Sequence, residues 1–298
     1  MSTKSIIQRK LLFPEILTPW PKTIHKHARG KILVCAGSRG MTGAAALVCE
    51  SAYRSGAGVV CLAFPESLSE IYEKILREVI TLPCPETSKQ TLSLAALPVI
   101  LKKSQEFDII VIGPGLSQNF ETCELVRKLI IKLEKSQVLD ADGLNALVGY
   151  VEILKKRKYP QIFTPHPGEM ARLCGINVNV LQKNREKIAK AKAREWQAIV
   201  VLKGADTVIA DFKGKVVINK TGGPALATAG TGDVLCGLIS TFWAQNLEKA
   251  FEAACTAVYL HGLAADLAQK DLGVRSIIAS DVIKYLPQAI KKESLSLG

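Results

Sequence analysis

Aromatic residues are scarce in this sequence, where tryptophan, tyrosine and phenylalanine make up 6% of 298 residues. The core must therefore be aliphatic. None of the eight cysteines forms a CxxC pair, and most lie in apolar or small-residue runs, so neither a zinc site nor a disulfide framework is indicated. No apolar run approaches the ~18 residues of a membrane span, and the N-terminus lacks the apolar stretch of a secretory signal. These absences predict a soluble, cytoplasmic protein that does not bind membranes.

Two common nucleotide-binding motifs are also missing. No GxxxxGK[ST] segment occurs, which excludes a P-loop NTPase. Gly37, Gly40 and Gly43 are spaced as GxxGxxG, which does not match the Rossmann fingerprint. The formal net charge of +12 suits an anionic ligand. Because the basic residues are scattered and no zinc-finger or RNP motif accompanies them, we expect no nucleic-acid partner.

From Lys31 onward, short apolar runs alternate with helical patterns. This alternation predicts an α/β fold with a mostly parallel central sheet and helices on both faces. We expect strands at 31–38, 58–65, near Ile80, 108–115, 137–143 and 161–169. Residues 198–222 read as two more strands joined by a Lys-Gly turn. Helices are expected at 42–58, 66–79, 92–107 (interrupted by Pro98), 121–135, 144–156, 181–196 and from Thr231 onward. Residues 1–30, broken by prolines, are expected to be a lead-in to a single domain, 31–298.

Six polar or glycine-rich clusters follow or close the predicted strands. They span residues 37–43, 113–116, 140–145, 164–169, 203–207 and 220–233. Because the carboxyl ends of parallel strands share one edge of a sheet, where ligands bind, these clusters predict a site there.

The last cluster is the most informative. Gly230, Thr231, Gly232 and Asp233 open a predicted helix, so backbone N–H groups and the helix N-terminus favour an anion. A carboxylate there would repel bound phosphate, unless Asp233 accepts the proton of a hydroxyl that is being phosphorylated. The alternative is that Asp233 only caps the helix.

The other polar residues of these clusters have more than one interpretation. His166, between two prolines, either contacts a ligand or is structural. Asp140 and Asp142 could bind Mg²⁺, but we favour their capping the next helix with Asn145. Lys203 meets a phosphate or extends its amine to solvent.

Two other features fall outside the predicted site. His261 lies on an apolar helix and is expected in the core. The strongly basic helix at 181–196 is expected to be a solvated outer face.

The ordered motifs resemble the ADP/ATP-dependent NAD(P)H-hydrate dehydratase family of the ribokinase-like superfold. They are GSRGMTGAA, GPGL, DADGLNAL, TPHPGE, LKGADT and GGPALATAGTGDVLCGLI, and the resemblance runs from about Lys31 to Pro287. GTGD marks only the superfold, whereas TPHPGE together with the GGPALATAGTGDVL stretch is more specific. The resemblance implies a three-layer α/β/α sandwich.

The resemblance also implies a reaction. Members repair hydrated NADH and NADPH by dehydrating the S epimer, with ADP or ATP as phosphoryl donor and Mg²⁺ neutralising the phosphate charge. Phosphorylation of the hydroxyl at C6 of the nicotinamide ring makes a good leaving group, which the ring nitrogen then expels. The family is often tetrameric, which implies a homotetramer here. Since about thirty residues precede the first predicted strand, an NAD(P)H-hydrate epimerase is expected as a separate chain.

Residue roles carried over from the family fall into three groups. Positions matching substrate contacts are Ala44, Gly115, His166 and Asp233, and Asp233 is also the expected catalytic base. Positions assigned to the nucleotide site are Lys203, Gly204, Ala205, Asp206, Thr207, Gly230, Thr231 and Gly232. Backbone N–H groups around Gly230, Thr231 and Gly232 would form the anion hole. No metal-ligating residues are assigned. One departure is Gly223, where the family often has Asn.

Two other functions share some of these features. A small-molecule kinase of the hydroxyethylthiazole type would use the same GTGD segment but release the phosphate ester, and TPHPGE argues against it. A nucleotide sensor would bind without turnover, and Asp233 argues against that because a carboxylate weakens phosphate binding.

Overall fold

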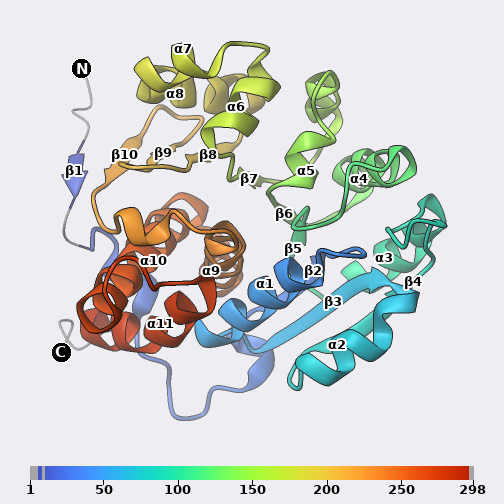
Figure 1. Ribbon diagram of the computed structural model, residues 1–298, viewed down its shortest axis with the longest axis horizontal. Coiled ribbons are helices and arrows are strands. Elements are labelled where there is room, and N and C mark those ends of the chain that lie inside the picture. Colours follow the sequence, from blue (N-terminus) through green and yellow to red (C-terminus); the bar gives the residue numbers. More distant parts are fainter. Residues whose placement is uncertain (1–5, 9–10, 295–298) are drawn as a thin grey trace.

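The computed structural model describes residues 6–8 and 11–294, which form a ten-stranded sheet with helices on both faces (Figure 1). The strand order is β1-β10-β9-β8-β7-β6-β5-β2-β3-β4. Among the described strands, only β9 runs antiparallel to its neighbours, β8 and β10. The predicted α/β class and the mostly parallel sheet are confirmed. The strands are β1 (Ile6–Gln8), β2 (Lys31–Cys35), β3 (Val59–Pro65), β4 (Ile80–Cys84), β5 (Ile109–Ile112), β6 (Ser136–Leu139), β7 (Gln161–Phe163), β8 (Ile199–Leu202), β9 (Val208–Ala210) and β10 (Val216–Asn219).

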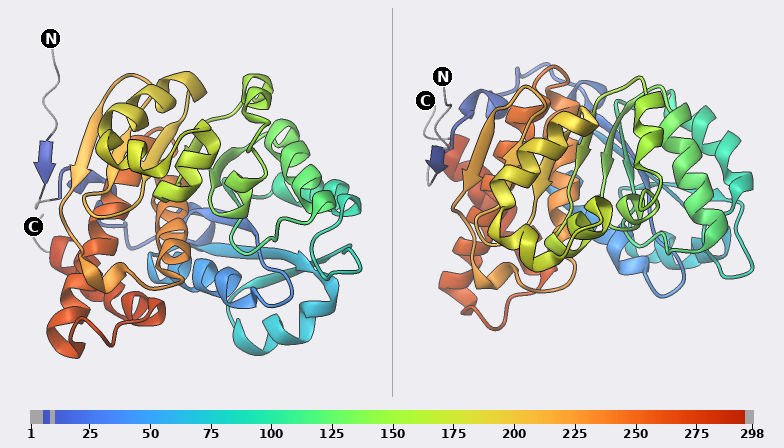
Figure 2. Two further views of the ribbon diagram at one scale, coloured as in Figure 1. Left: turned by 45° about the horizontal axis from the view of Figure 1, so that its top comes forward. Right: turned by 90° about the horizontal axis from the view of Figure 1, so that it is seen from above.

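Helices cover both faces because the central strands are apolar on both sides. In β2, Ile32 and Val34 pack into one core cluster, and Leu33 and Cys35 into the other. Figure 2 shows α9–α11 and α6–α8 on opposite sides of the sheet. The α-helices are α1 (Thr42–Arg54), α2 (Ser69–Ile75), α3 (Leu97–Ser104), α4 (Phe120–Lys132), α5 (Asp142–Asn145), α6 (Pro167–Cys174), α7 (Val178–Lys183), α8 (Arg185–Trp196), α9 (Thr231–Gln245), α10 (Ala250–Leu272) and α11 (Ala279–Ser294).

The segment before Lys31 contains structure that the sequence did not predict. Strand β1 pairs in parallel with β10, and the 3₁₀ helix Pro14–Leu17 buries Ile16 in the core beside Leu11. Pro14 begins this 3₁₀ helix, and a proline at that position removes a backbone donor without preventing the turn. The division into a lead-in and one domain stays a prediction.

Three other element predictions were wrong. Residues 198–222 form three strands rather than two, because Gly204 and Gly214 both take positive φ and turn the chain twice. Pro98 lies in the first turn of α3 and does not interrupt it, since the first turn needs no N–H there. The predicted helix 144–156 divides into α5 and the 3₁₀ helix Val151–Lys156, with Gly149 at positive φ between them.

The strand directions place all six predicted clusters at one edge. Strands β2, β5, β6, β7 and β8 are mutually parallel, and β10 regains their direction because the antiparallel β9 lies between β8 and β10. The clusters that follow these strands therefore share the carboxyl edge of the sheet, as the sequence predicted.

Candidate active site

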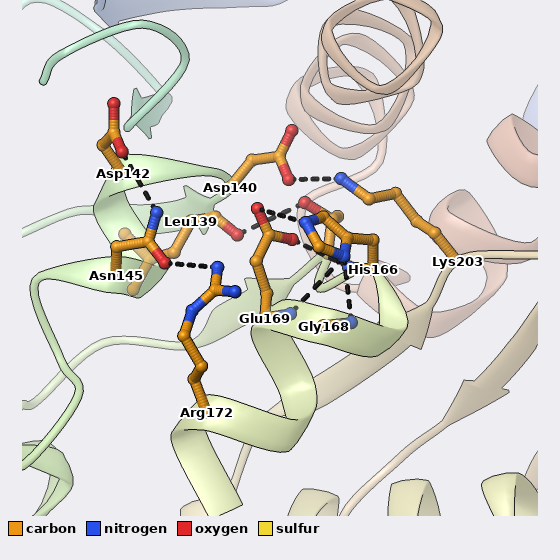
Figure 3. Close-up of polar contacts among 10 residues, drawn as sticks. Leu139, Asp140, Asp142, Asn145, His166, Gly168, Glu169, Arg172 and Lys203 are labelled. Atoms are coloured by element: carbon orange, nitrogen blue, oxygen red, sulfur yellow. Dashed lines mark hydrogen bonds and ion pairs between the residues drawn. The ribbon is translucent and has the colours of Figure 1, made fainter. Parts of the chain in front are cut away.

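A buried ion pair lies at the centre of the carboxyl edge. Asp140, directly after β6, accepts a hydrogen bond from Nζ of Lys203, directly after β8, at 2.6 Å (Figure 3). The two side chains are 2% and 17% exposed, so the pair is largely removed from water. Burial alone would lower the pKa of Lys203, but the carboxylates of Asp140 and Glu169 outweigh it and raise that pKa. The ammonium group is therefore charged and fixed.

Asp233 lies in the first turn of α9, close to this pair. Its pKa is raised from 3.8 to about 7: burial contributes most, the carboxylates of Asp140 and Glu169 act in the same direction, and Lys203 opposes them. A carboxyl group with a pKa near neutrality is suited to exchange a proton with a ligand at physiological pH.

The start of α9 offers an anion site beside Lys203. Gly230 is the N-cap and takes a φ of +89°, a conformation that favours glycine. A Cβ at Gly232 would lie 3.2 Å from Nζ of Lys203, so the helix backbone and the ammonium group are near neighbours. The unpaired N–H groups of a first helical turn and a lysine together bind phosphate.

A cavity of about 380 Å³ opens next to this helix start. Its walls come from the loop after β8, the loop after β10, the start of α9 and one face of α10. All five residues predicted from 203 to 207 line it, together with Thr231 and Gly232. The lining residues are Lys203, Gly204, Ala205, Asp206, Thr207, Asn219, Thr221, Gly222, Gly223, Pro224, Leu226, Ala227, Thr231, Gly232, Leu235, Val258 and His261.

The loop 203–207 is held from outside the cavity. Nη2 of Arg185 donates to the carbonyl oxygens of Leu202 and Lys203 at 3.1 and 3.2 Å, and Nη1 donates to that of Ala205. Asp206 pairs with Lys220. The basic helix α8 mostly faces solvent, as predicted, but Arg185 at its first position faces this loop.

His261 is buried, as predicted, but it also lines the cavity. Its Nε2 has no hydrogen-bond partner among the described residues. Burial lowers its pKa to about 4, so the ring is neutral at physiological pH. The apolar pattern of its helix gave no sign that one position faces a cavity.

His166 has a structural role in α6. Its Nδ1 accepts hydrogen bonds from the backbone N–H groups of Gly168 and Glu169 at 3.0 and 3.4 Å (Figure 3). The backbone N–H of His166 donates in turn to Oε2 of Glu169 at 2.7 Å. Burial, with Lys203 and Arg172 nearby, lowers its pKa. Because Nδ1 accepts, the proton of the neutral ring is on Nε2. The side chain remains half exposed, which leaves a ligand contact open to it.

The helix-capping interpretation of Asp140 and Asp142 was wrong. No side chain caps α5. Asp140 instead binds Lys203, and Asp142 accepts hydrogen bonds from the backbone N–H of Ser117 and from Nδ2 of Asn145. Asn145 in turn accepts a hydrogen bond from Arg172 of α6 (Figure 3). These contacts link the loop at Ser117 to α5 and α6. The sequence gives no signal for pairing residues that are 63 positions apart.

Ala44 and Gly115 lie together on another part of the edge. A Cβ added to Gly115 would lie 3.2 Å from Cβ of Ala44, and the Gly115 carbonyl accepts a hydrogen bond from Ser38. Neither residue lines the cavity. Gly230 does not line the cavity either, and a Cβ added to it would lie 2.6 Å from Cδ1 of Leu47 on α1.

Replacing Gly223 by asparagine is expected to change the free energy of unfolding by less than about 0.5 kcal/mol. Gly223 has an extended φ of −164°, and a Cβ there meets nothing within 4 Å. Gly222 is the matched control, because its φ is +78° and a Cβ would lie 2.7 Å from Leu226. Gly222→Asn should cost about 1–3 kcal/mol in denaturant unfolding. Equal costs at the two positions would contradict the geometry.

Two further findings concern the described residues. None of their helices is both long and apolar enough to cross a membrane. Within the same residues, no three His, Cys, Asp or Glu side chains are grouped as a metal site would require.

Comparison with known proteins agrees with this geometry. A family model described as NAD(P)H-hydrate dehydratase matches residues 32–288. The bifunctional NAD(P)H-hydrate repair enzyme Nnr of Moorella thermoacetica is 43% identical over 267 residues, covering 90% of this chain and 50% of the relative. Nnr of Escherichia coli is 33% identical, with 93% and 50% covered. The chain thus spans about half the length of these curated relatives.

Solved structures agree as well. The ADP/ATP-dependent NAD(P)H-hydrate dehydratase of Bacillus subtilis, co-crystallised with ATP and Mg²⁺, superposes with a TM-score of 0.79 at 32% identity, covering 95% of this chain and 98% of that one. A ribokinase-like superfamily protein of Enterococcus faecalis shares the fold, with a TM-score of 0.80 at 24% identity and 96% of each chain covered. The ribokinase-like fold is confirmed, and the chain belongs to the NAD(P)H-hydrate dehydratase family.

Proposed function

We propose that this protein dehydrates the S epimer of hydrated NADH or NADPH, with ADP or ATP as phosphoryl donor. The observation that carries the proposal is Asp233, a carboxyl group with a pKa of about 7 at a helix start that also borders the nucleotide-sized cavity. The similar Bacillus subtilis protein is described as ADP/ATP-dependent, which supports the same donors here.

The proposed reaction balances as two steps. First, the C6 hydroxyl oxygen attacks the terminal phosphoryl group of the nucleotide, and its proton passes to Asp233. Second, the lone pair of the ring nitrogen breaks the C6–O bond, which releases phosphate, and loss of a proton from C5 forms the C5=C6 double bond of NADH. ADP thus yields AMP and phosphate, and water leaves the substrate as part of that phosphate.

The residues around Asp233 have distinct roles in this proposal. Residues 203–207 bind the nucleotide, and Gly230, Thr231 and Gly232 present N–H groups to the transferring phosphoryl group. Lys203, which Asp140 holds in place, offsets the phosphate charge. Ala44, Gly115 and His166 would contact the hydrated dinucleotide, with Nε2–H of His166 as a donor.

Mg²⁺ fits the site only through the nucleotide. Among the described residues no three-ligand group exists to hold it, and Oδ1 of Asp140 is already hydrogen-bonded to Lys203. Mg²⁺ commonly combines few protein carboxylates with phosphate oxygens, so the nucleotide would supply its main ligands and Asp233 would remain free to act as the base. When bound, it would neutralise phosphate charge.

The direct test is incubation with S-hydrated NADH and each nucleotide. Return of the near-ultraviolet absorbance of NADH, with one phosphate released per turnover, supports dehydration. A stable phosphate ester formed from a hydroxyethylthiazole would instead support a small-molecule kinase. Nucleotide binding with neither product would identify a sensor.

The rate should depend on pH through Asp233. Because the base must be deprotonated, kcat/KM should fall about tenfold per pH unit below the pKa of about 7 and level off above it. A steady-state profile from about pH 5 to about pH 9 measures this. A profile that is flat across neutrality would exclude Asp233 as the base.

Partners and location complete the proposal. An NAD(P)H-hydrate epimerase would supply the S epimer, since spontaneous hydration is not expected to give one epimer alone. A homotetramer and a cytoplasmic location are proposed from the family. All eight cysteines are free, which suits a reducing compartment.

A further inference from the structure

The opposite, amino edge of the sheet carries two neighbouring cavities. The larger, about 500 Å³, lies where β7, β8 and β10 begin and β9 ends. The smaller, about 210 Å³, lies between the 3₁₀ helix Val151–Lys156 and the end of α8. Arg157 and Gln197 line both, so the two cavities share a wall. Neither borders the candidate active site.

Arg157 is a partly buried cation without a carboxylate partner. Its Nη2 donates to the backbone carbonyl of Gln197, while Nη1 is buried and has no hydrogen-bond partner among the described residues. No described acidic residue forms an ion pair with it. Burial lowers its pKa to about 10, which reflects the cost of desolvating an unpaired guanidinium. Because Arg157 lines both cavities, an oxyanion bound there would offset the charge of its guanidinium group.

Two further unsatisfied polar atoms belong to the same walls. Oε1 of Gln161, in the larger cavity, and Nε1 of Trp196, in the smaller, are buried without hydrogen-bond partners. Among the described residues, six buried side-chain atoms lack partners, and three of them belong to residues of these two cavities. Buried polar groups are normally satisfied, so this concentration sets the two cavities apart from the rest of the described residues.

The rim of the larger cavity favours an anion with an apolar part. Lys158, Lys213 and Lys215 contribute cations, against Asp211, Glu248 and Glu252. Nζ of Lys215 pairs with Glu252 at 3.3 Å, and the backbone N–H of Lys215 donates to Asp211. No carboxylate among the described residues pairs with Lys158 or Lys213. Tyr159 and Phe212 are 37% and 38% exposed at the same rim, where they could contact a ring.

We propose that the larger of these cavities, with Arg157 on the wall that it shares with the smaller one, is a second binding site, for a small organic anion. Its carboxylate or phosphate group binds Arg157, and its flat apolar part contacts Tyr159 and Phe212. The site is independent of the proposed reaction, because its residues come from the opposite edge of the sheet.

The test uses two probes that distinguish the anions, phenyl phosphate and benzoate, with the full-length protein. The chain has three tryptophans, so ¹⁵N-indole NMR gives three signals, and Trp196→Phe assigns the reporter in the smaller cavity. We expect one or both probes to shift the Trp196 signal saturably while Trp20, which lines neither cavity, stays unchanged. The probe that binds more tightly identifies the preferred anion.

Variants then test the assigned contacts. Arg157→Met should weaken probe binding by about tenfold or more, and Lys213→Glu, at an exposed turn, by severalfold. Arg77→Met is the matched control, because Arg77 is exposed and lines neither cavity. If Arg157→Met does not fold, Lys213→Glu decides the result. Equal affinity in Lys213→Glu and Arg77→Met, or no Trp196 shift with either probe, would overturn the proposal.

Discussion

Asp233→Asn is expected to lower kcat for dehydration by about 10²–10⁴-fold while nucleotide binding is kept. The amide cannot accept the hydroxyl proton, but Asp233 does not line the cavity, so its walls stay intact. Turnover assays and calorimetric titration with ADP measure the two effects. Near-normal turnover would remove Asp233 from the mechanism, and loss of ADP binding would make its role structural.

Asp233→Asn should also make the folded protein more stable than the wild type at high pH. The folded-state pKa of Asp233 is raised, so the folded protein holds this proton more tightly than the unfolded chain. Ionisation therefore costs stability as pH rises from about 4 to about 7. Asp233→Asn should recover on the order of 2–4 kcal/mol at pH 8 and little at pH 4. A stability difference that does not change with pH would contradict the raised pKa.

Lys203→Met is expected to destabilise the fold by about 3–5 kcal/mol, because it leaves Asp140 buried without its cation. Asp140→Asn should cost less, since Glu169 and Asp233 still provide carboxylates near Lys203. Denaturant unfolding of both variants measures this asymmetry. Lys203→Met should also raise the pKa of Asp233, because the positive charge of Lys203 lowers that pKa in the wild-type protein.

The double variant Lys203→Met with Asp140→Leu is the control. Because it removes both charges, it should recover much of the stability that Lys203→Met alone loses. Additive losses in the double variant would mean that the two groups do not interact. Lys284→Met provides a surface comparison, because Lys284 is exposed and pairs with Asp281. It should lower the free energy of unfolding by less than about 1 kcal/mol.

Much of the fold was predictable because apolar periodicity is a local signal. Runs such as KILVC and DIIVI need only their own residues to be recognised as buried strands. The antiparallel β9 was missed because three apolar residues between glycine turns are too short to show a period. Strand β1 was missed because its pairing with β10 joins residues about 200 positions apart.

For the candidate site, the position of the clusters was predictable from the sequence, but the contacts between their side chains were not. The topology rule placed the six clusters at one edge without any knowledge of side chains. The partners within the site were not predictable, because the sequence does not show that Asp140 points to Lys203 and not to α5. His261 shows the same limit, since an apolar helix face looks alike whether it meets packed atoms or a cavity.

The attachment of Arg185 to the loop 203–207 has a consequence for protein engineering. Helix α8 carries many of the surface charges that solubility or crystallisation redesign would replace with alanine or glutamate. Most of those replacements should be harmless, but replacing Arg185 would release the carbonyl groups of Leu202 at the end of β8 and of Lys203 and Ala205 in the loop that lines the cavity. A uniform charge swap along this helix would then look like damage to the active site, although no residue inside the cavity had been altered.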